Sequence, residues 1–120
     1  MEIVGSKAKK HFNLKEAEEF REKFFLRKRL FEMSDMHFNI YCIAAGQENP
    51  LHRHPGSDEI LYFVEGTGEC VCGEETYDVK TGDLVFVPKD APHAIRNTHK
   101  SENMVCILAQ SPLPCVHVAV

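Results

Sequence analysis

Four side chains between residues 52 and 93 are of the types that bind a transition metal. His52 and His54 are two residues apart, and on a β-strand such residues point to the same face. Glu59 follows a turn that contains Pro and Gly, and His93 comes from a more distant segment of the chain. Three imidazoles and one carboxylate suit Fe, Mn, Ni, Zn, Co or Cu better than Ca or Mg. The spacing predicts that these four residues can meet at one divalent metal per chain.

Four protein ligands would leave one or two coordination positions open, which is the usual condition for metal catalysis. No general acid or base can be assigned beside them. Four side chains could approach the cavity, but none has a partner or spacing that singles it out for proton transfer: Tyr41, Tyr62, Cys70 and Cys72. We interpret the remaining histidines as exposed or structural, because they fit no ligand spacing: His11, His37, His99 and His117.

The residues around the four candidates resemble the two signatures of the cupin family. The first signature is matched at Gly46, His52, His54, Glu59 and Gly66, and the second at Gly82, Pro88, His93 and Asn97. The second usually has a glycine where this chain has Asp90, a residue that tolerates left-handed backbone better than most. The resemblance covers roughly residues 36–110. It implies a double-stranded β-helix, or jelly roll, in which His52, His54, Glu59 and His93 converge on one metal.

The cupin resemblance leaves the activity open, because the family includes dioxygenases, decarboxylases, isomerases, lyases and proteins with no known activity. We favour a metalloenzyme that acts on a small organic molecule, with a slight preference for oxygenase chemistry, since a His-rich site with a carboxylate suits ferrous iron. The alternative is a non-catalytic module that binds a small ligand or metal. A third interpretation, a metal-free structural cupin, is weaker because every expected ligand residue is present.

The sequence pattern predicts an all-β protein with a short N-terminal helix. Asn13 and Glu16 resemble a capping pair, which predicts a helix within 13–29 that ends near Phe24. The β-like segments are 25–31, 36–44, 60–64, 69–72, 84–87 and 104–109. Residues 65–68 predict a hairpin and residues 80–83 a turn. We expect a helix and strand extension over 1–35 and the cupin barrel over 36–120, as a single domain.

Alternation along residues 60–64 predicts which side chains line the barrel. If Glu59 points inward, Leu61 and Phe63 do so as well, whereas Ile60, Tyr62 and Val64 point outward. Both faces are apolar, so we expect the N-terminal segment or a second subunit to cover the outer one, and a homodimer is predicted. An apolar wall would favour a small, partly hydrophobic ligand, and we assign it to Leu61, Phe63, Phe86 and Ile95.

Composition limits the possible partners and location. The 120 residues suit one domain, and a net charge of -4 argues against a nucleic-acid partner. No apolar run approaches the roughly 20 residues that cross a bilayer, and no secretory signal is evident, so we expect a cytoplasmic protein without a membrane partner. The five cysteines are expected to be free, because Cys70 and Cys72 would lie too far apart on one strand for a disulfide.

Overall fold

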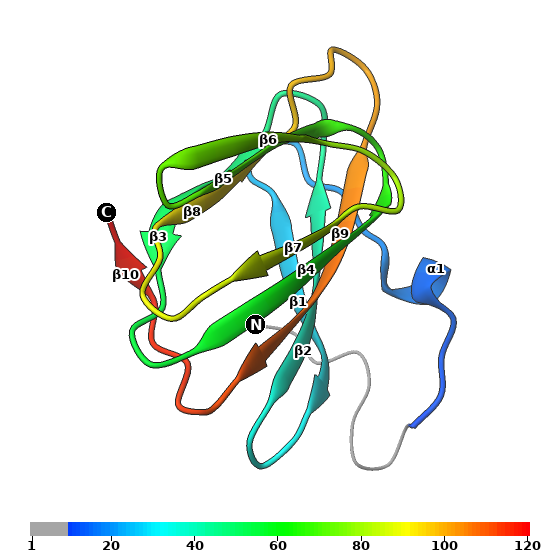
Figure 1. Cartoon of the computed structure of the whole chain (residues 1–120). Helices are drawn as coiled ribbons and strands as arrows, with labels where there is room; N and C mark the ends of the chain where they lie inside the picture. Colours follow the sequence, from blue (N-terminus) through cyan, green and yellow to red (C-terminus); the bar gives the residue numbers. More distant parts are fainter. Residues whose placement is uncertain (1–9) are drawn as a thin grey trace.

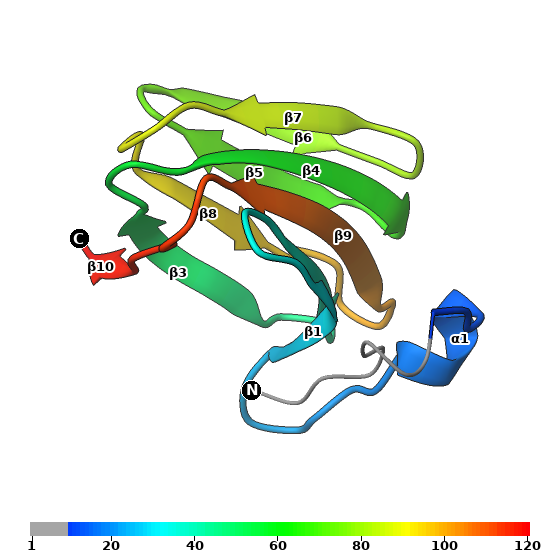
Figure 2. The same ribbon diagram turned by 90° about the horizontal axis from the view of Figure 1, so that it is seen from below.

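A computed structural model describes residues 10–120, and over these residues two five-stranded antiparallel sheets face each other (Figures 1 and 2). The first sheet has the order β1-β2-β9-β4-β7, formed by Leu26–Glu32, His37–Ile43, Met104–Ser111, Asp58–Glu65 and Leu84–Val87. The second has the order β10-β3-β8-β5-β6, formed by Val118–Ala119, Glu48–Arg53, His93–Arg96, Gly68–Cys72 and Glu75–Val79. The predicted all-β jelly roll with a short N-terminal helix is confirmed.

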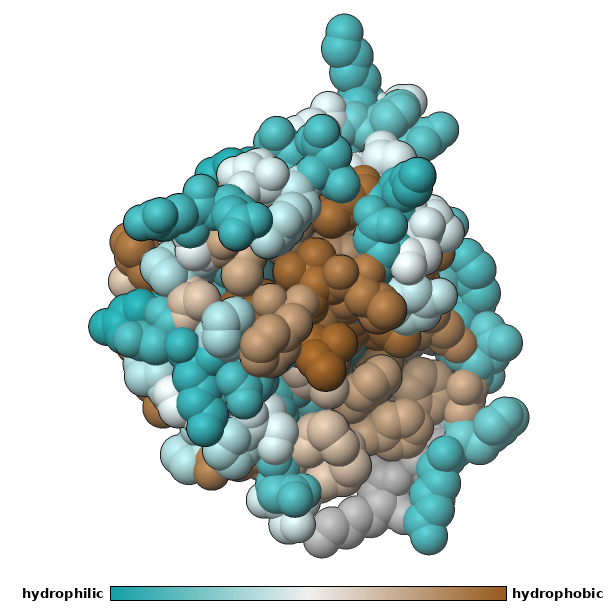
Figure 3. Space-filling model, in the orientation of Figure 1, coloured by the Kyte–Doolittle hydropathy of each residue, from teal (hydrophilic) through white to brown (hydrophobic). Residues whose placement is uncertain are grey.

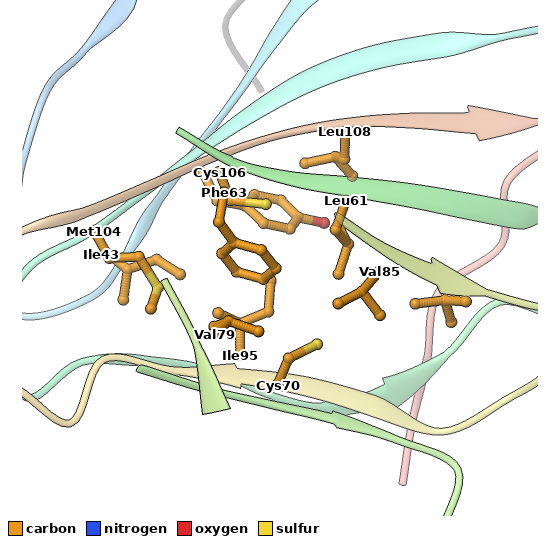
Figure 4. Packing of buried hydrophobic residues seen from close by; sticks show 12 residues of the cluster. Ile43, Leu61, Phe63, Cys70, Val79, Val85, Ile95, Met104, Cys106 and Leu108 are labelled. Atoms are coloured by element: carbon orange, nitrogen blue, oxygen red, sulfur yellow. The ribbon is translucent and has the colours of Figure 1, made fainter. Parts of the chain in front are cut away.

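The interior between the sheets follows the predicted alternation on β4. Leu61 and Phe63 are fully buried, whereas Ile60 and Tyr62 are 53% and 40% exposed on the outer face. Figure 4 shows Phe63 among side chains from both sheets, including Ile95. All six predicted strand segments form strands, but four further strands were not among them: β3, β6, β8 and β10. Four of the five residues of β6 are exposed, so this strand has no apolar pattern that would indicate it.

The predicted hairpin at residues 65–68 is wrong. This segment joins β4 in the first sheet to β5 in the second, so the two strands do not pair with each other. The glycines serve a different purpose from the one expected. A Cβ at Gly66 would collide with the backbone of Asn103, and one at Gly68 with the backbone of Arg96. Glycine is needed here because two chain segments pass in close contact where the chain changes sheets.

The predicted helix is also wrong in extent, because α1 spans only Leu14–Ala17. The capping box of Asn13 and Glu16 forms as expected, but the backbone is already extended at Glu18. Tertiary contacts hold the following segment in that form. The Gln47 side chain donates a hydrogen bond to the Arg21 carbonyl at 2.6 Å. The N-terminal segment instead packs apolar side chains on the outer face of β1, β2 and β9: Phe12, Leu14, Ala17 and Phe20. Packing overrides helix propensity here.

The extension predicted over 1–35 lies partly outside the described residues, which begin at residue 10. Within the described part, β1 pairs with β2 from Leu26↔Cys42 to Glu32↔His37 and so extends the first sheet. A boundary at residue 36 stays a prediction. Among residues 10–120 there is no helix of the length and apolarity that would cross a membrane.

Candidate metal site

Three histidines converge inside one end of the barrel. His52 on β3 and His93 on β8 are direct partners in the second sheet, and His54 follows β3 by one residue. All three rings are buried, and each offers a ligand nitrogen within 4.8 Å of the other two. Within residues 10–120 no other group of three or more His, Cys, Asp or Glu residues is gathered in this way. The sequence pattern therefore identified the cluster.

Each of these rings is oriented by a backbone carbonyl that faces its Nδ1 atom. A carbonyl oxygen only accepts, so each Nδ1 must carry a hydrogen, and in the neutral ring the lone pair then lies on Nε2. This tautomer is the one in which a histidine binds a metal through Nε2 while its other nitrogen is held in place. The three pairs are His52 with Pro50 at 2.7 Å, His54 with Val116 at 2.9 Å and His93 with Ala91 at 3.0 Å.

Glu59 approaches the histidines from the opposite sheet. Its Oε2 lies 2.9 Å from His93 Nε2, and its Oε1 lies 3.9 Å from His54 Nε2. Despite the short distance, neither Glu59 Oε2 nor the Nε2 atoms of His54 and His93 make an aligned hydrogen bond. Orphaned buried polar atoms are rare because they are costly. Two ligands bound at about 2.1 Å and at right angles lie about 3 Å apart, so a shared metal fits these atoms.

The protonation states favour the same assignment. Burial alone would raise the pKa of the Glu59 carboxyl, but His93 and Gln110 beside it outweigh that effect, and the pKa is lowered. Burial and the neighbouring His93 lower the pKa of His52 to about 4. Burial would lower the pKa of His93, but contact with Glu59 raises it overall. At neutral pH the site therefore combines an ionised carboxylate with a neutral His52, and both are metal-binding forms.

The candidates for proton transfer lie in unsuitable places. Tyr41 is 1% exposed, its hydroxyl has no hydrogen-bond partner, and burial raises its pKa well above the usual value. Burial likewise raises the pKa of Cys70 to about 12. Tyr62 points to the outer face of the barrel. Cys72 is part-buried, with its thiol directed at the Phe86 carbonyl. These positions single out none of the four as a general acid or base.

Of the four residues assigned to an apolar wall, three lie in the barrel interior and one does not. Leu61, Phe63 and Ile95 are buried in the barrel interior, as Figure 4 shows. Phe86 is 59% exposed and points outward, because β7 places Val85 and Val87 inside instead. The alternation of side chains along β7 decides which of them point inward. The sequence Leu-Val-Phe-Val is apolar at every position, so it does not show which face is buried.

Three residues near the site were missed from the sequence: Cys115, whose thiol lies 3.5 Å from His54 Nδ1, His117 and Gln110. His117 precedes β10, and its ring stacks on His52 with centroids 4.7 Å apart and planes 19° apart. No spacing rule indicated it, because β10 is only two residues long and pairs with β3 across 65 residues of sequence. Gln110 on β9 donates a hydrogen bond to Glu59 Oε1 at 2.7 Å. His99, in contrast, accepts from two backbone amides near residue 101, which is the structural role expected of it.

A cleft of about 360 Å³ opens beside His117. It is lined by Arg21, Phe25, Leu26, Arg27, Asn49, Pro50 and His117. His117 lines this cleft and its ring also contacts His52, so the cleft lies next to a residue that touches the histidine cluster. A second cleft, of about 430 Å³, lies between β6 and β7 and contains none of the candidate ligands.

Comparisons with known proteins agree with this architecture. The cupin domain family matches residues 39–109. An uncharacterised protein of Methanocaldococcus jannaschii is 35% identical over an alignment of 72 residues. The match covers 52% of this chain and only 58% of that protein. L-ectoine synthase of Aliivibrio fischeri is 30% identical over 71% of this chain and 67% of that enzyme. A crystal structure from Thermus thermophilus has a TM-score of 0.81 and 28% identity, and covers 87% of this chain and 98% of that one. Since the family match extends over more than half of the sequence, the chain belongs to the cupin family.

Proposed function

We propose that the chain is a metal-dependent cupin that binds one divalent transition metal through His52, His54, Glu59 and His93. One observation supports this most directly. Three buried histidines have their Nδ1 atoms bound to carbonyls, so Nε2 is the nitrogen of each ring that can bind a metal, and the Glu59 carboxylate lies 2.9 Å from the Nε2 of His93. Without a cation, such a cluster would leave several buried polar atoms unsatisfied. Binding a metal removes that cost.

We further propose that the protein is an enzyme acting on a small organic molecule. A divalent metal in this position would polarise bound groups or bind dioxygen. Fe is our preferred ion, with Mn, Ni, Zn, Co and Cu as alternatives, and oxygenase-type chemistry is slightly favoured. The cleft beside His117 offers an entry path, with the Phe25 ring and the Arg27 side chain on its walls. Similarity to a named enzyme, L-ectoine synthase, supports catalysis in general and not that particular reaction.

A non-catalytic binding module is the second candidate, and one observation favours it. Two of the groups that were considered for proton transfer are held neutral, since burial raises the pKa of both Tyr41 and Cys70. Such a site could bind a small ligand or the metal without turnover. Turnover against a broad panel of metabolites separates the two candidates, because a binding module would retain metal and ligand without consuming any compound.

Metal loading tests the ligand set. Protein that has been saturated with Fe(II), Ni or Zn and then desalted should retain close to one ion per chain by elemental analysis. The double variant His52→Ala, His54→Ala should lose most of that metal and keep a β-sheet circular dichroism spectrum. His99→Ala is the matched control, because the interactions of the His99 ring are local, with the backbone amides of Ser101 and Glu102 and with the Glu102 carboxylate, and it should retain full metal. Full retention by the double variant would refute the assignment.

Exogenous chelators test the open coordination positions. With Fe(II) restored anaerobically, pyruvate should perturb the metal's spectrum, and nitric oxide should give an iron-nitrosyl signal. Both probes need a position that no protein side chain fills. If neither probe binds to protein with one Fe(II) per chain, the oxygenase proposal fails first.

We also propose a homodimer through the uncovered half of the first sheet. The N-terminal segment covers β1, β2 and β9, but an apolar patch remains exposed over β4 and β7 (Figure 3). Its members, named here the β4–β7 patch, are Ile60, Tyr62, Leu84 and Phe86. None of them is charged, so a second copy related by a two-fold axis supplies a matching surface. Light scattering should give about twice the 13.7 kDa chain mass, and the Leu84→Lys, Phe86→Lys double variant should give a monomer.

A further inference from the structure

A row of polar side chains crosses the first sheet and ends at Glu59. Gln110 donates to Glu59 Oε1 at 2.7 Å, Asn39 Nδ2 donates to Gln110 Oε1 at 3.3 Å, and Arg29 Nε donates to Asn39 Oδ1 at 3.2 Å. The four residues come from four adjacent strands, β4, β9, β2 and β1. Glu59 lies directly opposite Gln110 in the sheet, and Asn39 directly opposite Arg29. At the outer edge, Arg29 also binds Glu32 at 3.0 Å.

The two amides at the centre of this row are buried. Asn39 is 1% exposed and Gln110 is 5% exposed, next to a Glu59 carboxylate that is 1% exposed. Buried polar groups are costly unless they are fully paired, and leucine-sized apolar side chains would pack between two sheets without that cost. A purely structural strand pair would gain nothing from these amides. Their presence points to a role at the carboxylate where the row ends.

The hydrogen bonds of the row can run in only one direction. A guanidinium only donates, so Arg29 requires the oxygen of Asn39 to face it, and the Asn39 amide nitrogen must then point at Gln110. The Gln110 oxygen accepts that bond, which turns the Gln110 nitrogen toward Glu59. A carboxylate only accepts, and this completes the row. The cation at one end and the anion at the other fix both amide orientations.

The result is an asymmetric Glu59 carboxylate. Oε1 is engaged by the Gln110 amide, whereas Oε2 has no aligned hydrogen bond and lies 2.9 Å from His93 Nε2. We propose that Arg29, Asn39 and Gln110 position Glu59 so that it binds the metal through Oε2 alone. This inference rests on the proposed function. The hydrogen bond to Oε1 disfavours the rotation that would bring both oxygens to the metal, and a coordination position stays available to an exogenous ligand.

Gln110 is a positioning residue in this proposal, and cobalt reports on it directly. Co(II)-loaded protein has visible absorption that depends on the number and kind of ligands. Gln110→Leu should leave one Co(II) per chain, weaken Co(II) binding by about 10–100-fold and change the visible spectrum, because outer partners of a ligand typically have effects of this size. The affinity of the Co(II)-loaded Gln110→Leu protein for pyruvate should fall by about tenfold, since the second oxygen of Glu59 would then compete with pyruvate for the same coordination position.

Two further variants separate positioning from packing. Gln110→Glu keeps the size of the side chain but turns an acceptor toward Glu59, so it should resemble Gln110→Leu. Asn39→Leu keeps the contact between Gln110 and Glu59 but releases the Gln110 amide to rotate, so its effect on the spectrum should be smaller. Asn97→Ala is the control. Asn97 is a buried amide that binds the carbonyls of Ile43 and Glu102, away from Glu59. It should lower the melting temperature without changing the cobalt spectrum.

Each result either supports or refutes the positioning role. An altered cobalt spectrum in both Gln110 variants, with an unaltered one in Asn97→Ala, would support it. Wild-type spectrum and affinity in a folded Gln110→Leu protein would refute it and leave the metal site itself intact. If wild-type protein bound no Co(II), the proposed function would fail, and the positioning role with it. Circular dichroism of each variant shows whether a lost spectrum reflects unfolding.

Discussion

The two halves of the barrel interior lie between the same two sheets but are built from opposite kinds of side chain. In one half, Phe63 packs among Ile43, Val79 and Met104, and the surrounding residues are apolar (Figure 4). In the other half, histidines, a glutamate and amides are buried just as completely. Packing of the first kind stabilises the fold through burial of apolar area. The second kind costs stability unless every polar atom has a partner.

The comparison shows how a small barrel can combine a stable core with a polar site. The apolar half needs only complementary shapes, and many combinations of side chains meet that need. In the polar half, carbonyls of Pro50, Ala91 and Val116 each fix one imidazole, and an amide fixes the carboxylate. Within the histidine and glutamate cluster, the buried atoms that remain without hydrogen-bond partners are His54 Nε2, His93 Nε2 and Glu59 Oε2. Stability and binding are therefore assigned to different ends of one interior.

The largest expected effect belongs to the apolar half. Phe63→Ala should lower the free energy of unfolding by about 3–5 kcal/mol, because it removes a fully buried aromatic ring and leaves a cavity between the sheets. Urea unfolding followed by circular dichroism measures the change. In protein that remains folded, metal stoichiometry should be unchanged.

The matched variant in the polar half is His54→Ala. It should reduce metal retention strongly but change the stability of the metal-free protein by less than Phe63→Ala. The reason is that the His54 ring already has a buried Nε2 atom without a partner, and the variant removes this unfavourable group together with the ring. If the two variants lost equal stability without metal, the division of the interior into two roles would be wrong.

Local signals in the sequence predicted the site better than they predicted the connections of the chain. The cupin signatures predicted that His52, His54 and His93 lie close together, and strand parity predicted that Leu61 and Phe63 point inward with Glu59. The sequence did not predict that the chain changes sheets at Gly66 and Gly68. A glycine-rich segment between two strands has the same local pattern whether it forms a hairpin or connects two sheets. Only the long-range contacts with Asn103 and Arg96 decide between them.

Sequence patterns did not predict the side chains that reach the site from distant segments of the chain. His117 contacts His52 through a strand of two residues, which is too short to show alternation. Gln110 is one of eight residues in β9 and carries no motif of its own. The helix was overestimated for a related reason: its capping box was real, but hydrogen bonding by Gln47 and packing of Phe20 hold the next residues extended.

Acid should weaken the metal-free protein through the polar half. The pKa of His52 is about 4 when folded and near 6.5 otherwise, because burial and His93 disfavour its charged form. Between these values the unfolded chain binds a proton at His52 that the folded one does not, so the contribution of His52 to stability falls as pH is lowered from about 6.5 to 4. A shift of this size corresponds to a loss of about 3 kcal/mol. The raised pKa of His93 acts in the opposite direction, because its folded form binds a proton more readily than the unfolded chain does.

Unfolding in urea at a series of pH values measures this effect, and His52→Asn is the control. The variant has no imidazole at this position, so its stability should decline less steeply over the same range. His54, His93 and His117 lie around the ring and remain in both proteins, so the difference between the two curves isolates His52. Parallel curves would show that some other group causes the acid sensitivity.

The smallest effect concerns Asp90, in the loop that leads from β7 to His93. Its backbone is left-handed at φ 66°, its amide donates to the His54 carbonyl at 3.0 Å, and its carboxylate pairs with Arg53. The expected tolerance of aspartate for this backbone is confirmed. Asp90→Ala should cost about 1 kcal/mol, because alanine is strained in this conformation and the exposed ion pair adds little.

Asp90→Gly separates these contributions. Glycine adopts the left-handed backbone without strain but loses the same ion pair, so the glycine variant should be more stable than the alanine variant. Thermal unfolding of both proteins measures the difference. Equal losses would show that the pair with Arg53, and not the backbone, is what Asp90 contributes. Metal retention should be unchanged in the glycine variant, because the carbonyl of Ala91 that orients His93 keeps its place when the loop keeps its conformation.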